Sequence, residues 1–79
     1  MNANIKQVVI ALESDFSNAQ RSGNKTAAAA TVSALAGIAL ALTPHTTELY
    51  NIISNVSNMP MNALSNEAQA IVTLISKNI

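Results

Sequence analysis

Few side chains in this sequence could do chemistry, and they are widely spaced. The chain has one histidine, four acidic residues and no cysteine. His45 and Glu48 are three residues apart near an expected helix start, but a metal centre on this pair would need further ligands from elsewhere in the fold. No serine lies in a recognisable nucleophile turn, and two glycines are too few for the phosphate-binding loops of nucleotide enzymes. We therefore predict a protein that is not an enzyme and that needs no cofactor or metal.

The nearest pair of carboxylates, Glu13 and Asp15, does not suggest a site either. At a spacing of two residues on a helix, the two side chains diverge. We interpret them as part of a solvated helix surface.

Direct binding to nucleic acid is not expected. The formal charge is zero, and the four basic residues are scattered among four acids, whereas backbone binding needs clustered lysine and arginine. A helix-turn-helix around residues 43–46 would have helices of suitable length. Its recognition helix would offer Tyr50, Asn51 and Glu48 but no basic residue.

The first expected helix covers about residues 4–21 and has one apolar side. Asn2 or Asn4 is its expected N-cap. Ile10 lies outside the apolar stripe, either as an ordinary exposed isoleucine or as a contact point for a partner. The stripe itself consists of Ile5, Val8, Val9, Leu12, Phe16 and Ala19.

The second expected helix covers residues 27–42, is rich in alanine and has no charge. Gly23 should end the helix before it, and Asn24 or Thr26 should begin it, while Thr43 and Pro44 should end it. One side carries bulky residues and the other carries small ones that let two helix backbones approach closely. The bulky side comprises Val32, Leu35, Ile38 and Leu42, and the small side, which we expect to pack between copies of the chain, comprises Ala30, Ala34, Gly37 and Ala41.

Two further amphipathic helices follow. The third should begin with Thr46 or Thr47 as N-cap, and the fourth either with Pro60 in its first turn or with Ser65 as N-cap. Their apolar stripes are Leu49, Ile52, Ile53 and Val56 in the third helix, and Leu64, Ala68, Ile71, Val72 and Ile75 in the fourth.

These patterns predict an all-α fold, with residues 1–79 forming a single helical domain of about four helices around the alanine-rich helix. A chain of 79 residues buries a limited core. Only 10% of its residues are charged, against about 25% in ordinary soluble domains. We therefore expect a bundle that is completed by homo-oligomerisation.

A membrane role is the first alternative. The sixteen residues 27–42 would span about 24 Å as a helix, against about 30 Å for the hydrocarbon core. Alanine, serine and threonine also insert weakly. We therefore expect a soluble, cytoplasmic bundle, and a holin-like membrane peptide is the less favoured alternative.

In its length, its single-domain helical pattern and its association-prone composition, the chain resembles the small phage-encoded antirepressors. The resemblance covers the whole chain but rests on no aligned motif, so no functional residue is carried over. It implies a regulatory protein that binds and inactivates or sequesters a protein partner, a transcriptional repressor of the lambda CI type. Apolar residues left outside the bundle are the candidate partner contacts: Ile10, Tyr50 and Ile79.

A self-assembling structural subunit is the remaining alternative. In that case the alanine-rich helix would pack against copies of itself. A discrete dimer or tetramer would favour the regulator, an open series of sizes would favour the assembling subunit, and solubility that depends on detergent would favour the membrane peptide.

Overall fold

Four α-helices and one short 3₁₀ helix build the part of the chain that the structure, a computed structural model, describes, residues 2–79. They are α1 (Asn2–Arg21), α2 (Lys25–Leu42), α3 (Thr46–Asn55), the 3₁₀ helix η1 (Val56–Asn58) and α4 (Met61–Ser76). These residues contain no strand, and the predicted all-α fold of about four helices is confirmed.

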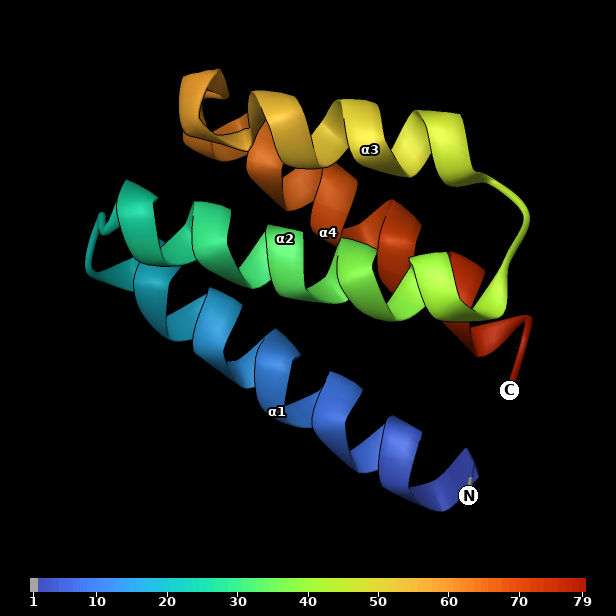
Figure 1. Cartoon of the computed structure of the whole chain (residues 1–79). Helices are drawn as coiled ribbons and strands as arrows, with labels where there is room; N and C mark the ends of the chain where they lie inside the picture. Colours follow the sequence, from blue (N-terminus) through green and yellow to red (C-terminus); the bar gives the residue numbers. More distant parts are fainter. Residues whose placement is uncertain (1) are drawn as a thin grey trace.

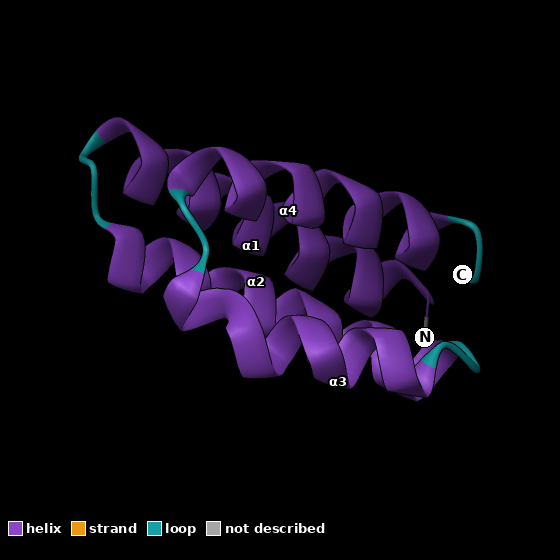
Figure 2. Ribbon diagram, turned by 90° about the horizontal axis from the view of Figure 1, so that it is seen from above, coloured by secondary structure: helices purple, strands orange, loops and turns teal. Residues whose placement is uncertain are grey.

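The alanine-rich helix α2 is the centre of the fold, as predicted. It packs against α1, α3, η1 and α4, whereas α1 and α4 make few contacts with each other. Figure 1 shows α1 below α2, α3 above it and α4 behind it. Seen from above, α4 runs along one side of the molecule while α2 and α3 run along the other (Figure 2).

Gly23 and Asn24 form the turn between α1 and α2, and Asn24 makes hydrogen bonds to both helices. Gly23 has a φ of 67°, and its N–H donates to Gln20 O at 3.2 Å while the Asn24 N–H donates to Ala19 O at 2.8 Å. This is a Schellman motif, which satisfies carbonyls at the end of α1. Asn24 Oδ1 then accepts from Ala27 N–H at 3.0 Å and caps α2. Gly23 ends α1 as predicted, and Asn24, one of the two predicted candidates, is the N-cap of α2. The helix itself begins at Lys25, two residues before the expected Ala27.

The start of α3 differs from the prediction by one residue. Thr43 and Pro44 end α2 as expected, but His45, not Thr46 or Thr47, is the N-cap of α3. The Thr43 hydroxyl accepts from the His45 N–H at 3.3 Å and holds His45 outside the helical conformation, with a ψ of 48°. Both threonines therefore lie inside the helix.

Two other predicted helix starts are also corrected. Pro60 precedes α4 as its N-cap with a ψ of 163°, so it is not a residue of the first turn, and Ser65 lies inside the helix. Asn4 lies inside α1, which begins at Asn2, so Asn4 is not an N-cap.

The core is one cluster that draws on every helix. Val32, Leu35, Leu49, Leu64 and Ile75 are its largest fully buried side chains. Val8 is an exception to the predicted stripe of α1, since its side chain is 49% exposed. It lies about 100° around the helix from the buried Val9, at the edge of the stripe.

One side of the central helix stays open, although α1, α3 and α4 all pack on α2. Only 39% of the residues in α2 are buried. Its bulky side carries the buried Val32 and Leu35, as predicted, while its small-residue side is not covered by this chain.

Candidate functional site

The one histidine lies beside Glu48 on the surface at the start of α3. His45 Nδ1 lies 3.2 Å from Glu48 Oε2, and both side chains are largely open to solvent. Throughout residues 2–79, no three histidine or acidic side chains gather closely enough to hold a metal ion. The pair therefore stands without further ligands and lines none of the hollows described below.

Glu13 and Asp15 diverge, as their spacing predicts. Glu13 faces α4, where it lines a groove. Asp15 borders a shallow hollow between α1 and α2, next to Ala30. The two carboxylates therefore do not form a common site.

A groove runs between α1 and α4, and we call it the α1–α4 groove. It has a volume of about 450 Å³. A second hollow of about 190 Å³ shares Glu13 and Val72 with it and continues along the two helices over Phe16 and Leu35. The groove is lined by Ala3, Lys6, Val9, Ile10, Glu13, Val72, Ile75, Ser76 and Ile79.

The groove exists because α1 and α4 both pack on α2 but make few contacts with each other. Figure 1 shows α1 leaving α2 progressively from the turn toward its start, which lies at the same end of the bundle as the end of α4. Val9 and Ile75 are buried beneath the groove, and Val72 and Ile79 are half-buried in its wall. Its only ionisable side chains are those of Lys6 and Glu13, both on α1.

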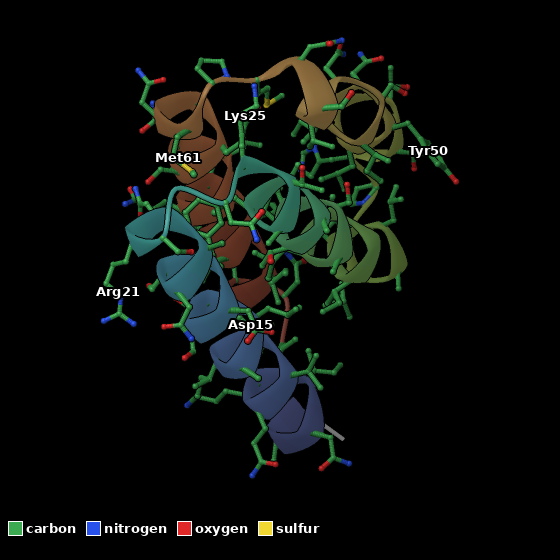
Figure 3. All side chains as sticks on the ribbon, turned by 90° about the vertical axis from the view of Figure 1, so that its left-hand side faces the viewer. Asp15, Arg21, Lys25, Tyr50 and Met61 are labelled. Carbon is green, nitrogen blue, oxygen red and sulfur yellow. The ribbon has the colours of Figure 1, made fainter. Side chains whose placement is uncertain are left out.

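The structure brings together two of the three residues predicted to contact a partner. Ile10, 56% exposed, and Ile79 line the same groove. Ile79 is half-buried and packs against the core, so it is not left outside the bundle as expected. Tyr50, 58% exposed, projects from α3 on a different part of the surface, away from α1 and α4 (Figure 3).

A second uncovered surface lies on α2, and we call it the open face. It consists of the exposed small residues Ala30, Ala34, Gly37 and Ala41. A methyl group added at Gly37 would meet no atom within 4 Å, so nothing in this chain packs there. The α1–α4 groove and the open face lie on opposite sides of α1. Asp15 borders the hollow beside the open face, and it points about 160° away from Ser17, which lines the continuation of the groove.

The sequence-based reasoning did not find the groove itself. The α4 wall, with Val72 and Ile79, could not be placed opposite α1 without the topology. One signal was nevertheless present, because Lys6, Ile10 and Glu13 recur at spacings of four and three and so share one side of α1.

By length and composition, α2 could also cross a membrane. It has 18 residues and spans about 27 Å at 1.5 Å per residue. The central helix of a soluble bundle satisfies the same criteria.

The chain was compared with protein-family models, with curated proteins and with solved structures, and none of the three comparisons gives a match. The function must therefore be argued from the surfaces.

Proposed function

We propose that this chain is a small non-enzymatic regulatory protein that binds and inactivates a protein partner. The observation that carries the proposal is the pair of uncovered apolar surfaces, the α1–α4 groove and the open face of α2. Among residues 2–79, no group of three histidine or acidic side chains that could hold a metal ion accompanies them.

Uncovered surfaces of this kind are costly for a protein with few charges. Ile10, Val8 and Tyr50 are exposed in a chain that is 49% hydrophobic and only 10% charged. Apolar patches mark protein interaction sites, and a low charge removes the repulsion that keeps molecules apart. Both features favour a protein that works while bound to another protein.

For the partner we propose a phage-type transcriptional repressor of the lambda CI type, which would make the chain an antirepressor. The support is the resemblance in length, helical pattern and composition. The balanced charge favours contact with the repressor over contact with its DNA. Inactivation would be steric, with the chain covering or sequestering the surface that the repressor needs.

Affinity capture tests the proposal. Tagged wild-type chain, incubated with lysate of its native host, should retain one protein in stoichiometric amount, and mass spectrometry should identify that protein as a repressor. Tyr50→Ala, which removes an exposed aromatic ring without touching the core, should retain less of it. A wild-type chain that retains no stoichiometric partner would overturn the proposal.

A self-assembling structural subunit is a second candidate, and the open face of α2 favours it. Small residues at helical spacing allow a helix of another copy to approach closely, which is the role expected for Ala30, Ala34, Gly37 and Ala41 from the sequence. Light scattering distinguishes the candidates. A closed oligomer supports the regulator, whereas sizes that grow continuously with concentration support the assembling subunit.

A holin-like membrane peptide is the third candidate, and the length and composition of α2 are what favour it. The packing of α2 against every other helix of the bundle favours the soluble form. Purification that requires detergent would support the membrane peptide.

A further inference from the structure

We propose that the α1–α4 groove binds α1 of a second copy of this chain. The two α1 helices would run antiparallel about a twofold axis that passes between residues 9 and 10. The inference goes beyond the proposed function and does not depend on it, because it concerns this chain alone.

Two opposite charges flank Ile10 on the groove side of α1. Lys6 and Glu13 line the groove from the same side of the helix, with Ile10 between them. They are seven residues apart, about 10 Å along the axis, which is too far for an ion pair with each other. Neither has an opposite charge three or four residues away, and within residues 2–79 neither forms an ion pair. Both charges are therefore available to a molecule that enters the groove.

The arrangement of Lys6 and Glu13 on α1 is complementary to the same arrangement on a second, antiparallel copy. In a twofold interface, a residue i that contacts j of the partner is matched by j contacting i of the partner. When two copies of α1 run antiparallel about an axis between residues 9 and 10, Lys6 faces Glu13 of the other copy and Glu13 faces Lys6. In this register the dimer contains two pairs of Lys6 and Glu13. A parallel arrangement in register would instead place Lys6 opposite Lys6 and Glu13 opposite Glu13.

Ile10 of one copy fits the apolar part of the groove in the other copy. In that register Ile10 of each copy lies next to the axis, opposite residue 9 of the other copy. Val9 and Ile75 form an apolar floor there, and Val72 and Ile79 form an apolar wall. The side chains that line the groove from α4 carry no charge, so an incoming isoleucine meets no ionised side chain on that wall. Burying Ile10 would also cover one of the large apolar side chains that are exposed among residues 2–79, with Val8 and Tyr50 as the others.

The assignment leaves the open face of α2 and Tyr50 for other partners. From the sequence alone, we expect Ile10 and Ile79 to contact the protein partner and the small-residue side of α2 to pack against another copy of the chain. The charges beside Ile10 favour the opposite arrangement, in which the groove holds a copy and the other side of the molecule remains free.

Charge reversal with sedimentation velocity tests the proposal on the full-length chain. The wild type should sediment mainly as a dimer of twice 8.2 kDa at a concentration where Lys6→Glu and Glu13→Lys each contain clearly more monomer. Each single reversal turns two attractions into two repulsions and should weaken dimerisation about tenfold. Mixing the two single variants, or combining both changes in one chain, restores opposite charges and should restore the dimer.

Matched controls separate this interface from general effects of charge. Asp15→Lys reverses a charge on the other side of α1 and should leave the dimer unchanged, and Ile10→Asp should give a folded monomer. Circular dichroism checks that all variants remain helical, since Lys6, Ile10, Glu13 and Asp15 are exposed. A monomeric wild type, single reversals that leave the mass unchanged, or a mixture that stays monomeric would each overturn the proposal.

The same variants distinguish this inference from the proposed function. Monomeric Lys6→Glu should still capture the protein partner through the open face. A dimer without any captured partner would overturn the regulatory role alone, and partner capture by a wild type that is monomeric would overturn the self-pairing alone.

Discussion

Ile10 on α1 and Ile79 beyond the end of α4 line the same groove, although they come from opposite ends of the chain. The groove thus depends on the topology of the bundle, in which α2 holds α1 and α4 side by side while they touch each other little. An exposed isoleucine that looks isolated in the sequence becomes part of a continuous apolar surface.

Gly37→Ala should stabilise the folded chain. The added methyl group meets no atom within 4 Å, and alanine favours a helix interior over glycine by about 0.8–1 kcal/mol. Urea unfolding at a fixed protein concentration measures the change. A loss of stability would mean that another copy packs so closely on Gly37 that a methyl group does not fit.

Leucine at two nearby alanines should have opposite effects. Ala34 lies on the open face, so Ala34→Leu should leave stability nearly unchanged but reduce partner capture. Ala36 is fully buried, so Ala36→Leu should overfill the core at a cost of about 1–3 kcal/mol. Thermal melts and affinity capture on both variants check the pair. Undiminished capture by Ala34→Leu would exclude the open face as the partner surface.

Leu35→Ala should unfold much of the population at ambient temperature. Leu35 is fully buried at the centre of the core, where such a truncation costs about 2–5 kcal/mol, and a bundle of this size has little stability to lose. Val8→Ala is the control, because Val8 is exposed and a surface change of this type costs about 0.5 kcal/mol or less. Similar losses in both variants would show that α1 packs differently from the description above.

Asn24→Ala should destabilise the fold by about 0.5–2 kcal/mol, because the side chain that caps α2 is lost. Asn66→Ala, an exposed position inside α4, should have no such effect, since alanine suits a helix interior. Chemical denaturation of the two variants gives the comparison. Equal stabilities would show that the cap contributes little to the turn.

The helices were predictable because their signals are local. The apolar stripes, Gly23 with its left-handed conformation, and Pro44 after Thr43 each depend on a few neighbouring residues. Helix starts were less certain where several capping residues compete. His45 precedes two threonines, and only the hydrogen bond from its N–H to Thr43 shows which residue begins α3.

The surfaces were less predictable because they depend on contacts between distant residues. Val8 fits the stripe of α1 by spacing, yet no element of the chain covers that edge of the helix. The groove likewise depends on how α2 holds α1 beside α4 with few contacts between them, which no pattern within either helix encodes. Uncovered residues such as Ile10 could be identified from the sequence, but not the residues that lie beside them.

The proposed inactivation of a repressor is tested most directly by displacement from DNA. A CI-type repressor from the same host is bound to its labelled operator, and the wild-type chain is titrated in while fluorescence anisotropy is recorded. An antirepressor should lower the anisotropy to the value of free operator once the chain reaches stoichiometric amounts. Anisotropy that stays at the value of the repressor–operator complex in a large excess of the chain would contradict the proposed function.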